Sequence, residues 1–414
     1  MKMESLLILG RQPALGLAEL ESLYGADSVH RAGNSAAILS VDPCILAFDR
    51  LGGSSKFAKV LTTLETTKWS EIEKFLVKVS PEHSTAMSEG KLQLGLSLYG
   101  FSESIQRITA TGLNIKKAIK KTGRSVRYIQ NKTADLNSAQ VKHNHLTGEH
   151  GWELLFVKDG QKTIVAQTIK VQDIESYTLR DRKRPFRDAK VGMLPPKLAQ
   201  IIINLAVGKV PESALQSICD IPAGQPIPHP ILNQTILDPF CGTGVILQEA
   251  MLMGYGAYGT DLEQRMVKYS EDNATWMASN FPVSNNDTRF EPADACSYTW
   301  PHKFDFIATE TYLGRPFTSR PSQDVLKQTI ADCQLIIRKF LKNVAGQLKS
   351  GDRLCVGVPA WQINQNQFQH LPLIDQLDDL GYTRVSFEHA GNNDLIYYRP
   401  DQIVARQLLV IIRK

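Results

Sequence analysis

The sequence predicts an α/β protein whose C-terminal part is a doubly wound parallel sheet with one antiparallel strand at its C-terminal edge. Two observations support this fold class. Residues 236–250, ILDPFCGTGVILQEA, have the pattern of a buried strand, a glycine turn and a helix that begins at once. After a helix-length gap, Asp261 stands at the tip of the next apolar strand, residues 258–261. In an open α/β sheet this arrangement places a ligand above the carboxyl ends of the strands.

Length and composition allow several domains. The chain has 414 residues, of which 43% are hydrophobic and 21% charged, enough for two or three soluble domains. A formal net charge of +5 does not by itself establish a nucleic-acid partner. The six cysteines include no C-x-x-C pair, so we expect neither a disulfide framework nor a metal site. No run is long enough to cross a membrane and no signal peptide is evident, so we expect a cytoplasmic protein without a membrane partner.

The first 80 residues predict a small α+β domain. An apolar strand at 6–9 is followed by helical apolar spacing over 15–23, a strand at 36–41 and a helix near 70–79. Residues 80–90 are polar and contain a proline and a glycine, so we interpret them as a linker.

Residues 81–170 predict a second domain with a basic surface. A strand at 92–98 precedes a helix at 105–121 and further strands at 125–129, 152–157 and 163–168. Clustered cations of this kind contact RNA phosphates and position the RNA, although a solvated helix face explains them equally well. The candidate RNA-binding residues are Lys116, Lys117, Lys120, Arg124, Arg127 and Lys132.

A basic linker, residues 171–195, leads into the last domain, residues 196–414. The run RDRKRPFR at 180–187 is followed by MLPPKLA at 193–199, and the prolines suit an extended segment that ends at the first turn of a helix. Arg182, Arg184 and Arg187 are further candidate RNA contacts. Apolar runs around Pro400 predict an antiparallel hairpin at the C-terminus.

The glycine turn is not typical of a phosphate-binding loop. Leu247 stands where a dinucleotide fold has its third glycine, and Val245 stands where a P-loop has lysine. The acidic Asp238 would repel phosphate oxygens and suits a ligand that carries a positive amino group.

The run DPFCGTG at 238–244 resembles motif I of the class I S-adenosylmethionine-dependent methyltransferases that act on amino groups of RNA and DNA. The R-P-F…P-P-K-L-A arrangement is similar to the linker of the tRNA guanosine N2-methyltransferases that act at position ten. Residues 81–170 resemble the RNA-binding THUMP domain of that family, and residues 1–80 resemble its ferredoxin-like N-terminal piece. The resemblance covers most of residues 90–270. It implies S-adenosyl-L-methionine as cofactor, tRNA as partner and N2-methylation of a guanosine.

The resemblance also assigns cofactor contacts. In this family the residue matching Asp238 lies near the methionine part of the cofactor, the residue matching Asp261 binds both ribose hydroxyls, and the one matching Asp294 faces the adenine amino group. The complete set of candidate cofactor-binding residues is Asp238, Phe240, Gly242, Gly244, Asp261, Leu262, Asp294 and Ala295.

The acceptor motif departs from the family pattern. Amino-methyltransferases usually have Asp or Asn, two prolines and an aromatic residue after the fourth strand, whereas this chain has Glu310, Thr311 and Tyr312 followed by Leu313. An oxygen of Glu310 could hold an N–H of the base and orient its amine, while Tyr312 supplies a stacking face. We take Glu310, Thr311 and Tyr312 as the candidate catalytic residues and Arg315 as an RNA contact.

Two alternatives stay open. The altered motif also fits a protein that binds cofactor and RNA without transferring a methyl group, and the fold alone fits a methyltransferase for DNA or another amine. The sequence does not indicate which tRNA or nucleotide is the target, whether one or two methyls are added, or whether a partner protein is needed.

Overall fold

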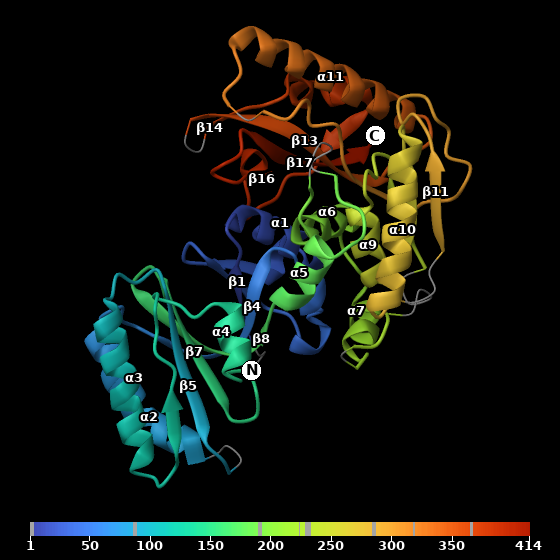
Figure 1. The fold of residues 1–414 in the computed structure, drawn as a ribbon. Helices are drawn as coiled ribbons and strands as arrows, with labels where there is room; N and C mark the ends of the chain where they lie inside the picture. The colour runs from blue at the N-terminus through green and yellow to red at the C-terminus, as the bar shows by residue number, and fades with distance from the viewer. Residues whose placement is uncertain are drawn as a thin grey trace. The chain divides into compact units, whose positions relative to one another are not determined.

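The computed structural model (Figure 1) describes residues 4–85, 89–188, 193–222, 224–227, 233–283, 287–317, 319–364 and 367–414. The chain forms two compact units. Unit 1 comprises Met1–Pro13, Asp27–Asp49 and Ser54–Ser176, and unit 2 comprises Ala14–Ala26, Arg50–Gly53 and Tyr177–Lys414.

Unit 1 is built on a sheet in the order β2-β3-β1-β4-β8-β7-β5-β6. Its strands are β1 Ser5–Leu9, β2 Val29–Ala32, β3 Ala36–Leu39, β4 Ser54–Leu64, β5 Leu92–Tyr99, β6 Val126–Tyr128, β7 Gly151–Asp159 and β8 Lys162–Val171. Its helices are α2 Trp69–Thr85, α3 Ile105–Lys120 and α4 Ser138–His143. Apolar side chains of α2 and α3 pack against β5, β6 and β7, because each helix has one apolar face.

Strands from both predicted front domains share this sheet, since β4 pairs with β8 in antiparallel register. The division into residues 1–80, 81–170, 171–195 and 196–414 stays a prediction. The linker expected at 80–90 is wrong in its first part. Helix α2 continues through Pro81 to Thr85, and it buries Ser80 and Ser84.

Unit 2 contains the sheet that the sequence predicts, in the order β11-β10-β9-β12-β13-β17-β15. The strands are β9 Thr235–Asp238, β10 Gly256–Asp261, β11 Thr288–Pro292, β12 Phe306–Glu310, β13 Arg353–Asn364, β15 Tyr382–Arg384 and β17 Val404–Arg413, with β14 Gln367–Gln369 and β16 Ile396–Tyr397 at its margins. Strands β11, β10, β9, β12 and β13 run parallel to one another. Strand β17 runs antiparallel to both of its neighbours, β13 and β15. The α/β fold class is confirmed. The predicted antiparallel strand is β17, which lies between β13 and the edge strand β15.

Helices cover both faces of this sheet (Figure 1). Helix α11 Gln323–Ala345 packs on one face, and α6 Pro196–Val207, α9 Val245–Leu252 and α10 Gln264–Asn280 lie on the other. Helices α5 Ile174–Arg182 and α7 Glu212–Cys219 complete the unit. The strand order reverses between β9 and β12, so the carboxyl ends of these two strands flank the place where α/β sheets bind ligands.

Helix α1 Pro13–Tyr24 is part of unit 2 although it lies near the N-terminus of the chain. Its buried Glu19 accepts hydrogen bonds from the backbone N–H groups of Gly52 at 3.0 Å and Gly53 at 2.8 Å, and from Asn204 of α6 at 2.8 Å. Arg50 extends the network by donating to Asn204 and to the Tyr255 hydroxyl. Burial raises the pKa of Glu19 to about 7, although these hydrogen bonds oppose the shift.

None of the helices in the described ranges is long and apolar enough to cross a lipid bilayer. Among the same residues, no group of three or more His, Cys, Asp or Glu side chains is placed to hold a metal ion.

Candidate active site

The glycine turn after β9 leaves an open space in front of its backbone. Gly242 has a φ of +51°, and a Cβ added there would approach no described atom closer than 4.0 Å. Gly244, with a φ of +77°, begins helix α9, and a Cβ there would lie 2.9 Å from the Ser270 Oγ on α10. Gly244 is therefore required for packing, whereas Gly242 lets a ligand approach the turn.

Asp238 lies buried at the end of β9. Its Oδ1 accepts hydrogen bonds from the Phe240 N–H at 3.2 Å and from the Thr309 hydroxyl of β12 at 2.6 Å. Burial raises the pKa of Asp238 to about 7, and the negative charges of Asp261 and Glu310 contribute in the same direction. A positively charged ligand group at this position would offset both effects.

Asp261 and Asp294 follow neighbouring strand ends, since the Ala293 N–H donates to the Asp261 carbonyl at 2.9 Å. The carboxylate of Asp261 accepts the N–H of Gly242 at 2.9 Å and that of Glu263 at 3.0 Å, one on each oxygen. Each oxygen keeps a lone pair that could accept a ligand hydroxyl. Burial raises the pKa of Asp261. Asp294 is exposed, and its Oδ1 accepts the Cys296 N–H at 2.9 Å.

The remaining cofactor candidates lie in different surroundings. Phe240 is half-buried and meets the ring of Phe340 edge-on at 5.1 Å. Leu262 is 74% exposed, so its side chain could cover a bound base. Ala295 is buried in the hydrophobic core, and only its backbone could meet a ligand.

Glu310, the last residue of β12, forms an ion pair that the sequence did not suggest. Arg406 of β17 donates from Nε to Glu310 Oε1 at 2.6 Å, and the two side chains are only 7% and 12% exposed. Strand β13 separates β12 from β17, so residues 96 positions apart in the chain meet across the sheet. One signal was available: Arg406 and Gln407 interrupt an apolar strand, and a buried charge needs a partner.

Thr311 and Tyr312 have different environments. Thr311 is buried, and both its N–H and its hydroxyl donate to the Gly357 carbonyl, at 2.9 and 3.0 Å. Thr311 thus holds the loop after β12 against β13. The Tyr312 side chain is 45% exposed and could stack on a base, and partial burial raises the pKa of its hydroxyl. At Gly314, with a φ of +86°, a Cβ would lie 2.6 Å from Thr329, so the loop passes close to α11.

The candidate RNA contacts differ in exposure. Lys117, Lys120, Arg127, Lys132, Arg182, Arg187 and Arg315 are exposed. Lys116 and Arg124 are half-buried, and Arg124 donates to the Ser84 carbonyl. Arg184 is buried at 3% exposure, which leaves it poorly placed to meet an RNA phosphate.

Part of the basic linker is helical, which corrects the expectation of an extended segment. Residues 180–182 form the last turn of α5, and Arg180 makes a buried bidentate pair with Glu249 of α9, at 2.6 and 3.3 Å. Phe186 stacks on Tyr269 with ring centroids 4.3 Å apart. Its N–H donates to Asn273, which in turn donates to the Thr243 carbonyl in the glycine turn. This linker therefore supports the turn as well as contributing charge.

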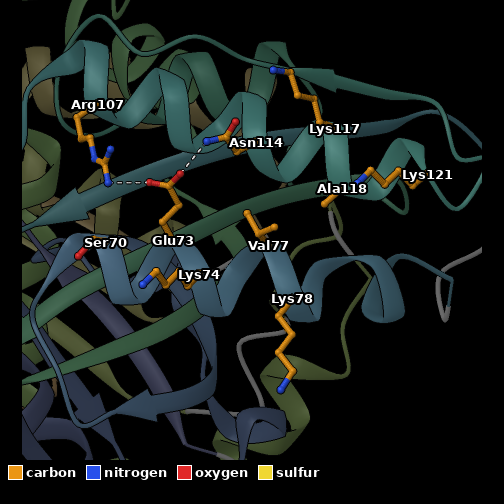
Figure 2. Close-up of a pocket in the computed structure, with 10 residues that line it drawn as sticks. All are labelled: Ser70, Glu73, Lys74, Val77, Lys78, Arg107, Asn114, Lys117, Ala118 and Lys121. Atoms are coloured by element: carbon orange, nitrogen blue, oxygen red, sulfur yellow. Dashed lines mark hydrogen bonds and ion pairs between the residues drawn. The ribbon is translucent and has the colours of Figure 1, made fainter.

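In unit 1, a groove of about 540 Å³ lies between α2 and α3 (Figure 2). Glu73 accepts hydrogen bonds there from Arg107 at 3.0 Å, Asn114 at 2.7 Å and Thr111 at 3.1 Å. The groove is also lined by four exposed lysines: Lys74, Lys78, Lys117 and Lys121. Lys117 is among the predicted RNA contacts, whereas Lys74 and Lys78 are not, because they come from a different helix and no spacing rule links the two helices.

No family model matches this chain. The tRNA (guanine(10)-N2)-dimethyltransferase of Methanothermobacter thermautotrophicus is 30% identical over 214 residues, which are 51% of this chain and 52% of that protein. The protein of the same name from Pyrococcus abyssi is 27% identical over 162 residues, 38% of this chain and 40% of that protein. The chain thus spans about half the length, or less, of the curated relatives it matches.

Among solved structures, TrmN from Thermus thermophilus aligns over 100% of both chains with a TM-score of 0.51 and 15% identity. This likeness shows a shared fold. Together with the strand order of unit 2, it establishes that the chain has the class I methyltransferase fold, and its sequence is similar to tRNA guanosine N2-dimethyltransferases over about half its length.

Proposed function

We propose that the protein is an S-adenosylmethionine-dependent tRNA methyltransferase that methylates the N2 amine of a guanosine. One structural observation carries the proposal. Glu310 is the last residue of β12, and its carboxylate lies next to the open glycine turn that follows β9. The hydrogen bond from Thr309 to Asp238 joins the ends of the two strands. The relatives named tRNA (guanine(10)-N2)-dimethyltransferase supply the substrate class.

The residues around the turn fit this cofactor. Asp238 offers a carboxylate to its amino group, Asp261 offers two oxygens to the ribose hydroxyls, and the space before Gly242 admits it without a clash. Leu262 and Asp294 would meet its adenine. Bound there, the cofactor would supply a methyl group on a positively charged sulfur, which would keep the electron pair of the S–C bond on transfer.

Glu310 and Tyr312 would prepare the acceptor amine. The N2 lone pair of guanine is delocalised into the ring, so orientation is the main requirement for attack. A Glu310 oxygen accepts one N–H and fixes the direction of the amine, while the exposed Tyr312 ring stacks on a base removed from its helix. The amine forms its bond to the methyl carbon and then releases a proton to Glu310 or to water.

Unit 1 would hold the tRNA. The lysines of the α2–α3 groove and the exposed cations near the end of α3 are suited to contact phosphates, which fixes position without reading sequence.

The direct test is methyl transfer from radiolabelled S-adenosylmethionine to unmodified tRNA transcripts, followed by digestion and identification of the labelled nucleoside. We expect N2-methylguanosine or N2,N2-dimethylguanosine. Label on another nucleoside would overturn the guanosine assignment, and label on DNA alone would overturn the tRNA assignment.

A second candidate has one observation in its favour. The Thr311 hydroxyl and one oxygen of Glu310 are already bound to protein groups, as expected if the acceptor site were silent. A protein with an inactive acceptor site would bind tRNA and cofactor in equilibrium binding measurements, but it would leave every nucleoside unlabelled in this transfer assay.

A further inference from the structure

The ion pair between Glu310 and Arg406 leaves specific hydrogen-bonding groups unused. Among the described residues, Glu310 Oε2 has no hydrogen-bond partner, and neither has either Nη group of Arg406. The pair therefore presents carboxylate lone pairs and guanidinium N–H groups next to one another at the end of β12.

The sheet is shaped so that this pair can form. Glu310 is in register with Gly357 of β13, and Arg406 pairs with Pro359 two residues further along that strand. A Cβ added at Gly357 would be in ordinary van der Waals contact with Glu310, 3.8 Å from its Cβ.

Stability alone is a weak reason for such a pair. Burying two charges costs about as much as their attraction returns, and apolar residues of similar size are often equally stable. Glu310 also lies close enough to Asp238 for its negative charge to raise the pKa of that carboxyl.

The unused groups match one nucleobase edge. Guanine presents the N2 amino group, then N1–H, then the O6 carbonyl, which are two donors followed by an acceptor. Adenine and cytosine present an amino group followed directly by an acceptor nitrogen. A carboxylate can accept from two adjacent donors, and the arginine that holds it can donate to the oxygen beyond them.

We propose that Arg406 is a positioning and specificity residue. It would hold Glu310 so that the carboxylate accepts the N2–H and N1–H of guanine, while an Arg406 Nη donates to O6. This inference rests on the proposed function. It adds that guanine is selected through its N1–H and O6 by a residue outside the acceptor motif.

The test compares tRNAs that carry either guanosine or 2-aminopurine ribonucleoside at the methylated position. 2-Aminopurine keeps the N2 amine but has an acceptor at N1 and no O6. Single-turnover rates are measured for the wild-type protein, for Arg406→Lys, and for the control Arg413→Lys. Arg413 lies on the same strand and donates to the carbonyls of Ala345 and Gly381. The Arg413→Lys variant therefore shows the effect of replacing an arginine that has only a structural role.

We expect wild-type protein to prefer guanosine strongly, and Arg406→Lys to lower that preference about tenfold or more, as for loss of a hydrogen bond to a charged donor. Arg413→Lys should leave the preference unchanged. An equal loss of rate on both bases in Arg406→Lys would mean a purely structural role and would overturn the inference. Equal wild-type rates on the two bases would overturn it without any variant, even if Arg406→Lys failed to fold. Absence of transfer to guanosine by wild-type protein would instead overturn the proposed function.

Discussion

Asp238 is the residue whose protonation should control cofactor binding. Burial raises its pKa to about 7, so the folded protein holds this proton more tightly than the unfolded chain, whose value is near 3.8. Its contribution to stability is therefore full below about pH 4 and is lost as the pH rises to about 7. Under the proposed assignment the cofactor amino group meets the ionised carboxylate, so affinity should increase between pH 6 and 8, with release of protons on binding.

Calorimetry in two buffers of different ionisation enthalpy at pH 7 measures this release. Asp238→Asn is the matched control, because it keeps the side-chain shape and leaves only the titration of the cofactor itself. We expect weaker binding and less proton release in Asp238→Asn. Identical proton release by both proteins would contradict the role assigned to Asp238.

Asp261 offers a second prediction at this scale. Asp261→Asn should weaken cofactor affinity about tenfold, since one charge-assisted hydrogen bond to a ribose hydroxyl is lost. tRNA affinity should not change, because the groove lysines lie in unit 1. Equilibrium binding of each ligand checks this, and unchanged cofactor affinity would refute the assignment of Asp261.

Single residues show where sequence analysis succeeds. The positions of Asp238, Asp261 and Glu310 follow from strand ends that are visible in the chain, and the structure places them around one turn. Arg406 was missed because its partner lies two strands away in the sheet. Arg184 is buried, because a basic run in sequence does not show which side its side chains face.

At the scale of elements, α1 is held in unit 2 by Glu19. Glu19→Ala would leave the N–H groups of Gly52 and Gly53 and the amide of Asn204 without an acceptor. Each buried unsatisfied group costs about 1–3 kcal/mol, so loss of this acceptor for three groups should lower the free energy of unfolding by at least about 3 kcal/mol in urea titrations. Glu21→Ala on the same helix is the control, since its contacts with Glu388 and His389 are more exposed and its loss should be smaller. Equal effects would argue against the network.

The groove between α2 and α3 gives a prediction for tRNA affinity. Lys74→Gln with Lys78→Gln should weaken binding and reduce the slope of log K against log salt by about 1 for each lysine that meets a phosphate. Lys209→Gln with Lys349→Gln removes two exposed charges from unit 2 as a control. A groove variant whose salt slope matches that of wild-type protein would exclude these lysines from the RNA contact.

Element boundaries were predictable where the apolar period was clear, as in α3 and β5. Helix α2 extends past Pro81 because tertiary burial of Ser80 and Ser84 outweighs the local signal of a polar, proline-containing stretch. The docking of α1 in unit 2 could not be seen in the sequence, since it depends on hydrogen bonds between residues about 185 positions apart.

For the whole molecule, the two units are not two consecutive segments of the chain. A fragment that begins at Tyr177 lacks Ala14–Ala26 and Arg50–Gly53, which belong to unit 2. It would leave Asn204, Tyr255 and Arg353 without their partners Glu19, Arg50 and Ser22. We expect this fragment to be unfolded or insoluble by circular dichroism and sedimentation, whereas a folded fragment with the melting temperature of the 414-residue chain would contradict the division. The need for unit 1 in catalysis is therefore better tested by the groove substitutions than by truncation.

We propose that Glu310 orients a guanosine amine for methyl transfer and that neither tRNA nor cofactor depends on it for most of its affinity. The most direct measurement is the single-turnover transfer rate of Glu310→Gln on tRNA, taken with its affinities for tRNA and S-adenosylmethionine. We predict a rate at least about a hundredfold below wild type with both affinities retained, because an orienting carboxylate is lost while the turn stays intact. A Glu310→Gln variant that labels guanosine at the wild-type rate would show that the carboxylate has no role in methyl transfer.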